Sequence, residues 1–91
     1  MLNHKVNVIN KLGLHARPAA KLTQKANEFL SQIELSKGER TVNAKSIMGV
    51  MLLAAAYGSE LILTVDGADE EEAMVEISQL FVNGFGEEID A

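Results

Sequence analysis

The sequence predicts an α/β (α+β) fold, an open-faced β-sandwich in which a four-stranded antiparallel sheet carries three helices on one face. Stretches with alternating apolar residues and stretches with apolar residues at helical spacing follow one another in the order strand, helix, strand, strand, helix, strand, helix. These elements are too few to cover both faces of a sheet with helices, so we expect the helices to share one face. At 91 residues the chain is expected to be one domain, 1–91.

The first two elements are expected to be a strand and an amphipathic helix. Val6 and Val8 alternate with polar residues in 3–10, which indicates a strand. In 16–29 apolar residues recur at helical spacing. Pro18 suits the first turn of that helix, because a proline there loses no hydrogen bond.

The middle of the chain indicates a hairpin and then a short helix. Within 32–43, two alternating stretches flank a turn at Gly38. The residues of 46–55 are apolar on more than one side and predict a helix with Ser46 as its N-cap, ended by Gly58.

The remainder of the chain predicts a strand and a helix. Apolar residues alternate along 60–66, as in a strand with one buried side. Asp69, with Glu72 three residues later, resembles a capping box at the start of the last helix, and Gly84 or Gly86 is expected to end that helix.

Charge is unevenly distributed along the chain. The formal net charge of −5 argues against general nucleic-acid binding. All eight Lys and Arg residues lie between Lys5 and Lys45, whereas most acidic residues follow them. Either one part of the surface favours anionic ligands or acidic partners, or the asymmetry only reflects an acidic last helix.

Several classes of protein and site are excluded or disfavoured. Without cysteine there are no disulfides and no thiolate metal sites, and His4 and His15 alone make a poor transition-metal site. The acidic run 69–72 suits the positive end of a helix better than a metal ion, so we expect neither metal nor cofactor. No apolar stretch approaches the ~20 residues of a membrane helix. The N-terminus lacks the apolar core of a signal peptide, so we expect a cytoplasmic protein without membrane insertion.

His15 is the first candidate functional residue, because it is expected at the start of a helix. Up to about four backbone N–H groups lack partners there and the helix dipole is positive, so an anion is favoured. A neutral imidazole nitrogen is a competent nucleophile toward phosphorus, and Arg17 could donate to phosphate oxygens. The alternative is that His15 is an ordinary surface residue and Arg17 a solvated charge.

Ser46 is the second candidate. Its ordinary role would be to cap the short helix, which stabilises a helix by about 1 kcal/mol. The apolar residues Ile47, Met48 and Met51 that follow it exceed one buried stripe and indicate an exposed docking surface. A phosphate on Ser46 would place negative charge beside that surface.

At these two places the sequence resembles the HPr family, the histidine-containing phosphocarriers of the bacterial phosphoenolpyruvate-dependent sugar phosphotransferase system. Residues 11–19, KLGLHARPA, match the family's active-site motif, and residues 45–51, KSIMGVM, match its regulatory-serine motif. The similarity covers nearly the whole chain. It implies a sheet with strand order first, fourth, second, third.

The resemblance also implies roles for individual residues. His15 would accept a phosphoryl group on Nδ1 from phosphorylated Enzyme I and pass it to a histidine of an Enzyme IIA domain. Arg17 and the backbone N–H groups of Ala16 and Arg17 would bind the phosphate. Such a protein is a reactant in a relay more than a turnover catalyst.

The second motif implies regulation and docking. Ser46 would be the target of an HPr kinase/phosphorylase in bacteria that have one. Ile47, Met48 and Met51 would form part of the docking face shared by the partners. We expect a monomer.

Other functions remain open at this point. One is a nitrogen-related paralogue of the family that serves regulation instead of sugar uptake. Another is a regulatory binding protein whose output is the phosphorylation state of Ser46. A small-metabolite regulatory domain on a similar sheet would need neither His15 nor Arg17.

Overall fold

The elements follow one another in the predicted order. The computed structural model describes residues 1–87. Its elements are β1 (Leu2–Asn7), α1 (Ala16–Ala26), β2 (Gln32–Lys37), β3 (Arg40–Asn43), α2 (Ile47–Leu52), β4 (Glu60–Asp66), α3 (Glu70–Val82) and the 3₁₀ turn η1 (Gly84–Gly86).

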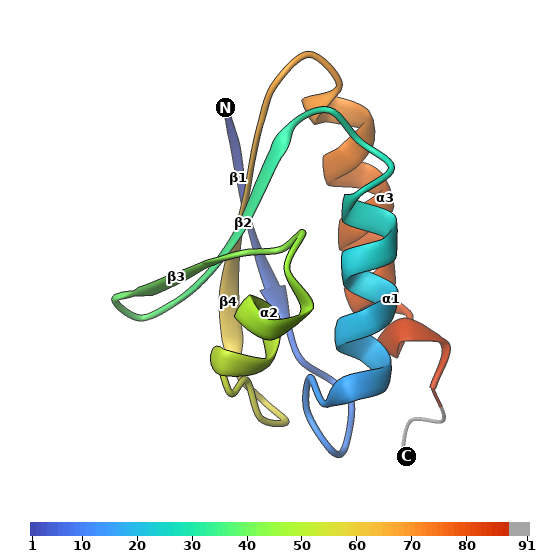
Figure 1. The fold of residues 1–91 in the computed structure, drawn as a ribbon. Helices are drawn as coiled ribbons and strands as arrows, with labels where there is room; N and C mark the ends of the chain where they lie inside the picture. Colours follow the sequence, from blue (N-terminus) through green and yellow to red (C-terminus); the bar gives the residue numbers. More distant parts are fainter. Residues whose placement is uncertain (88–91) are drawn as a thin grey trace.

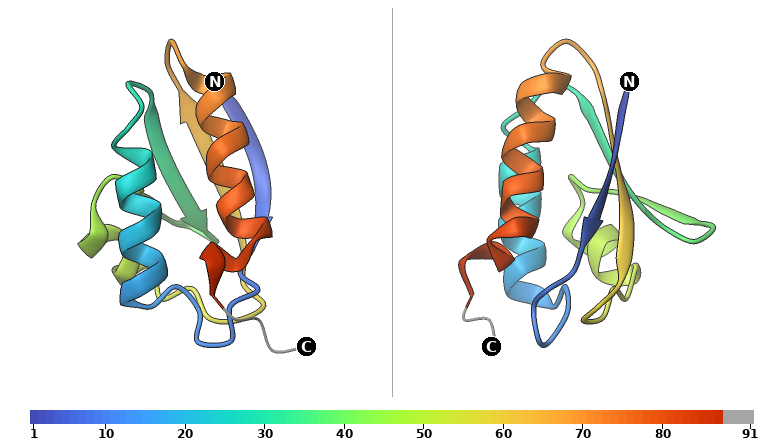
Figure 2. Two further views of the ribbon diagram at one scale, coloured as in Figure 1. Left: turned by 90° about the vertical axis from the view of Figure 1, so that its right-hand side faces the viewer. Right: turned by 180° about the vertical axis from the view of Figure 1, so that it is seen from behind.

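The four strands form one antiparallel sheet in the order β1-β4-β2-β3. The helices α1 and α3 lie side by side on one side of this sheet, and α2 lies on the same side (Figures 1 and 2). The expected open-faced sandwich is therefore confirmed, and the strand order is the one that the family resemblance implied.

The core lies between the sheet and the helices. The alternating side chains Leu61, Leu63 and Val65 of β4 are fully buried, as their spacing predicts. On the other face of the sheet, the hydroxyls of Ser36 and Thr41 lie 2.8 Å apart as a cross-strand pair on β2 and β3. One face of the sheet is thus apolar and covered, and the other carries polar pairs.

The first helix ends three residues before the predicted end of 16–29. Asn27 is its C-cap. The side-chain amide of Asn27 donates to the carbonyl of Thr23 and to the carbonyl of Lys45, which is 18 residues away in the sequence. The amide of Phe29 then bonds to Ala26 in a tighter turn, and the Phe29 side chain is buried. The apolar spacing extends to Phe29 because that residue packs in the core from a turn, not from the helix.

The second helix is also shorter than predicted, ending at Leu52 and not near Gly58. After Leu52 the backbone amides of Leu53 and Ala54 donate to the carbonyls three residues earlier, those of Val50 and Met51 respectively. Ala54 then adopts a left-handed φ of 52°, which reverses the chain direction. Apolar residues that were expected within the helix therefore belong to the turn after it.

The predicted capping box at Asp69 does not form. The Asp69 side chain makes no hydrogen bond to its own helix and instead accepts from the amides of Leu30 and Ser31, at 2.8 and 2.9 Å. The carboxylate of Glu70, not that of Asp69, accepts a hydrogen bond from the preceding turn, from the amide of Gly67 at 3.1 Å. The start of α3 is thus used to hold the turn that follows α1.

This contact predicts acid-sensitive stability. The Ser31 hydroxyl, and next the amide of Leu30, lower the pKa of Asp69 below its ordinary value of 3.8. Because the pKa of this carboxyl is lower in the folded protein than in the unfolded chain, its ionised form stabilises the fold at pH values above the unfolded-state pKa. This stabilisation is lost as the pH falls through the folded-state pKa. Asp69→Asn should therefore lower the free energy of unfolding at pH 7, and the difference from wild type should shrink toward about pH 3.

Urea unfolding at both pH values measures this difference. Glu71→Gln, in the same helix turn but exposed, is the matched control and should show a smaller effect. A difference between Asp69→Asn and wild type that stays constant with pH would contradict the assignment.

Candidate active site

The loop before α1 fixes the position of His15. Gly13 has a φ of +70°, and a Cβ there would lie 2.5 Å from the carbonyl oxygen of Ala55, so only glycine fits. Its amide donates to the carbonyl of Asn10, and the amide of Leu14 donates to Ala55, both at 2.9 Å. The loop is thereby attached to the segment after α2, and the buried Leu14 side chain anchors it in the core.

His15 is the N-cap residue of α1, as the sequence predicts. Its carbonyl accepts from the amide of Ala19, whereas its side chain makes no capping hydrogen bond. Pro18 has no N–H, so the amides of Ala16 and Arg17 remain as first-turn donors without a helical acceptor. Both residues are exposed. The imidazole therefore stands beside two available amides at the positive end of the helix.

Arg17 differs from most of the other cations. Most of the Lys and Arg side chains bond to groups of the protein: Lys21, Lys37, Arg40 and Lys45 bond to backbone carbonyls, Lys5 and Lys25 bond to carboxylates, and Lys11 also has a partner. Arg17 is exposed, and its side chain has no hydrogen bond or ion pair among residues 1–87. Most of the basic side chains thus make contacts within the fold, whereas the Arg17 side chain, two residues from His15, is open to a ligand.

The structure adds two residues that the sequence analysis did not single out. The Nε2 atom of His15 lies 3.2 Å from Oε2 of Glu87, and the other carboxylate oxygen of Glu87 accepts from the Asn10 amide at 2.6 Å. An open hollow is lined by Lys11, Leu12, His15, Ala16, Arg17 and Glu87. The elements at this end of the molecule, the start of α1 and η1, are neighbours in Figure 1.

Ser46 is the N-cap of α2, as predicted, and its hydroxyl accepts from the amide of Gly49 at 3.1 Å. Ile47, Met48 and Met51 are exposed, as a docking surface requires. The structure adds further exposed apolar side chains in α2 and in the neighbouring loops, namely Leu12, Leu52 and Tyr57. Helix α2 packs against α1, which brings the Ser46 region and the His15 helix into one part of the fold.

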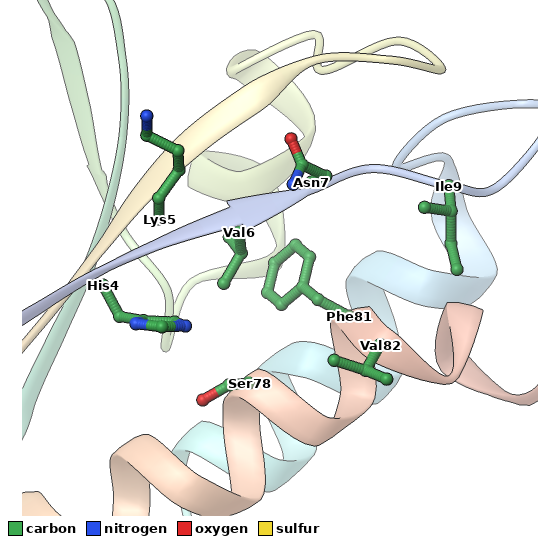
Figure 3. Close-up of a pocket in the computed structure, with 8 residues that line it drawn as sticks. All are labelled: His4, Lys5, Val6, Asn7, Ile9, Ser78, Phe81 and Val82. Atoms are coloured by element: carbon green, nitrogen blue, oxygen red, sulfur yellow. The ribbon is translucent and has the colours of Figure 1, made fainter.

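A second hollow lies between β1 and α3 (Figure 3). It measures about 210 Å³, and His4 and Val6 point into it from β1, facing Ser78 and Phe81 of α3. It shares no lining residue with the hollow at His15. His4 is exposed, as expected for a strand residue.

Neither a metal centre nor a membrane-spanning helix is found within residues 1–87. No group of three or more His, Asp or Glu side chains there is placed to hold a metal ion. No helix in this range is both long and apolar enough to span a membrane.

Comparisons with known proteins show the family of this chain. Residues 2–83 match the family described as "PTS HPr component phosphorylation site". The phosphocarrier protein HPr of Cupriavidus necator is 56% identical over 87 residues, which are 96% of this chain and 98% of that protein. The HPr-like protein Crh of Bacillus subtilis is 49% identical over 78 residues, 86% of this chain and 92% of that protein.

A solved structure of HPr-C-His from Thermoanaerobacter tengcongensis has the same fold. It superposes with a TM-score of 0.94 at 46% sequence identity, covering 98% of this chain and all of that one. With the family match over most of the chain and these identities, the chain belongs to the HPr family, the phosphocarrier proteins of the phosphotransferase system.

Proposed function

We propose that His15 is the residue that carries the phosphoryl group, accepted on Nδ1 from phosphorylated Enzyme I and passed to a histidine of an Enzyme IIA domain. The family implies both partners. The observation that carries the proposal is the position of His15 at the mouth of α1, where its side chain is 37% exposed. A group that two partners must reach in turn has to be accessible, and this one is.

The neighbouring groups suit a phosphoryl ligand. The amides of Ala16 and Arg17 have no helical acceptor, so they can donate to phosphate oxygens without breaking a bond of the fold. The guanidinium of Arg17 adds a planar donor group and a positive charge. Because these groups are already in place, they stabilise negative charge on the transferring group without reorganisation.

The test is phosphorylation by Enzyme I and phosphoenolpyruvate. We expect one acid-labile, base-stable phosphoryl group per chain, and tandem mass spectrometry should place it on the peptide that contains His15. A phosphoryl group on the peptide containing His4, or none at all, would overturn the proposal.

For Ser46 we propose a regulatory role, with an HPr kinase/phosphorylase as the modifying enzyme where one is present. The exposed side chains of Ile47, Met48 and Met51 beside it are proposed as part of the docking face for the partners. We further propose that the protein acts as a monomer in the cytoplasm. Negative charge at Ser46 would then act on docking more than on the fold, because it is favourable at the start of a helix.

Ser46→Asp should separate these two effects. Aspartate is itself a good N-cap, and its charge meets the helix dipole, worth about 0.3–1 kcal/mol, so the melting temperature should hold or rise slightly. Binding to Enzyme I should weaken by about tenfold, and less at high salt, if the partner brings acidic groups.

Thermal unfolding and phosphoryl-transfer kinetics on the same sample measure both quantities. Ser46→Asn is the matched control, because asparagine caps a helix equally well without a charge. Equal losses of transfer with Asp and Asn, or a collapse of stability with Asp, would contradict a charge-based switch.

A further inference from the structure

The residues after α3 are held in a specific path toward His15. Phe85 is buried with a left-handed φ of 57°, and its ring meets that of Phe81 edge-on at 4.9 Å. The ammonium of Lys21 donates to the carbonyl of Phe85 at 2.7 Å. A non-glycine residue persists in this conformation only where its surroundings hold it there. The core and α1 thus determine where the next side chain, that of Glu87, lies.

Asn10 fixes the carboxylate of Glu87. The Asn10 side chain is buried, and its amide nitrogen donates to the carbonyl of Gly84 at 2.7 Å and to Oε1 of Glu87 at 2.6 Å. Both hydrogens of the amide are therefore used on the segment after α3. The other oxygen of the carboxylate, Oε2, lies 3.2 Å from Nε2 of His15, within ion-pair distance.

We infer that Glu87, held by Asn10, is a positioning residue for His15: its carboxylate keeps the imidazole proton on Nε2 and leaves the lone pair of Nδ1 available for the phosphoryl group. The inference rests on the proposed function of His15. A carboxylate accepts hydrogen bonds and cannot donate one when ionised, so the nitrogen facing it is the protonated one. The same logic orients the histidine in catalytic triads.

This arrangement suits both halves of a carrier's work. When Nδ1 attacks, an N–P bond forms, the bond from phosphorus to the donor's leaving atom breaks, and its electron pair stays with that atom. The ring then carries positive charge with its proton still on Nε2, and Glu87 offsets that charge. On transfer to the acceptor the N–P bond breaks, its pair returns to Nδ1, and the ring is neutral again. Neither step requires His15 to gain or lose a proton.

The charged groups around the imidazole act in different directions. Among the described residues that line the hollow, Glu87 is acidic, while Lys11 and Arg17 are basic. Arg17 and the first-turn amides favour the anionic phosphate, and Glu87 favours the cationic ring. The Glu87 side chain is only 16% exposed, so water screens its effect less than at a fully open surface.

The experiment compares Glu87→Ala and Glu87→Gln with wild type, with Glu71→Gln as a charge-matched control in the first turn of α3, at the opposite end of the molecule (Figure 1). Nitrogen-15 NMR of histidine-labelled protein at about pH 8.5, where histidine is neutral, reports which ring nitrogen is protonated. For the His15 ring, wild type and Glu71→Gln should show the proton on Nε2 alone, and Glu87→Ala should show a mixture of both tautomers. Glutamine has one acceptor oxygen where the carboxylate has two, so Asn10 and Nε2 compete for it, and Glu87→Gln should also show a mixture of tautomers.

Single-turnover transfer from Enzyme I gives the second measurement. Glu87→Ala should lower the maximal rate by about tenfold with little change in the concentration for half-maximal rate, and Glu87→Gln should lie between. Phe85 remains in both variants, so melting temperatures should stay near wild type. If Ala lowers stability, the Gln variant still tests the loss of charge through the rate.

The outcomes separate the two proposals. Absence of any phosphohistidine in wild type would overturn the proposed function itself. Phosphorylation of His15 on Nε2, or wild-type tautomers and rates in Glu87→Ala, would overturn the role of Glu87 while leaving His15 as the carrier residue.

Discussion

Replacing His15 with alanine should abolish phosphorylation by Enzyme I and phosphoenolpyruvate while leaving the fold intact. The imidazole is the proposed nucleophile, and among the described residues that line the hollow no other side chain carries an imidazole. The fold should survive because the His15 side chain is 37% exposed and makes no capping hydrogen bond to α1. Radiolabel transfer from phosphoenolpyruvate and circular dichroism of the same sample measure both results.

His4→Ala is the matched control for this variant. It removes the other histidine of the chain, which is exposed on β1 and lines a different hollow. We expect full labelling of His4→Ala. Labelling retained in His15→Ala, or lost in His4→Ala, would show that the phosphoryl group is carried elsewhere.

Arg17→Ala should slow phosphoryl transfer by about 10²-fold without abolishing it. Loss of one donor from a preorganised set that stabilises developing negative charge has an effect of this order. Transfer should continue because the amides of Ala16 and Arg17 do not depend on the side chain. Stability should change little, since the side chain is exposed and has no partner among residues 1–87.

Two further variants make the measurement specific. Arg17→Lys should recover part of the rate, because lysine keeps the charge but lacks the planar donor group. Lys5→Ala removes a positive charge from β1, where Lys5 pairs with Glu60 at 3.5 Å, and should transfer at the wild-type rate. Rapid-quench kinetics with both partners measure the rates. A wild-type rate in Arg17→Ala would show that Arg17 is not part of the phosphate site.

The starts of helices were predictable from the sequence, as was the end of α3 just before Gly84, whereas the ends of α1 and α2 were not. Pro18 marks a helix start by its missing N–H and Ser46 by accepting from the nearby amide of Gly49, and a sequence pattern can show such local features. The end of α1 depends on Asn27 bonding to the carbonyl of Lys45, 18 residues away. The end of α2 depends on a left-handed alanine, Ala54, a conformation that its residue type does not indicate.

The same distinction applies to the site. His15, Arg17 and the first-turn amides come from one short stretch, and their grouping follows from the rule that helix starts attract anions. Glu87 comes from the other end of the chain and lies in an acidic stretch that continues into 88–91, outside the described residues. One signal was present, because Gly84, Phe85 and Gly86 form a sharp turn directly before Glu87. Only packing, however, shows that the turn leads to His15.

The path from Asn10 to Glu87 spans 77 residues, so the pair of His15 and Glu87 exists only when both ends of the chain have folded together. On the ribosome, Asn10 and His15 emerge long before Phe85 and Glu87 are synthesised. A nascent chain therefore has the nucleophile of the site before it has the carboxylate that orients it. Fragments that contain α1 alone should bind anions weakly at the helix start but should not reproduce the oriented histidine of the complete fold.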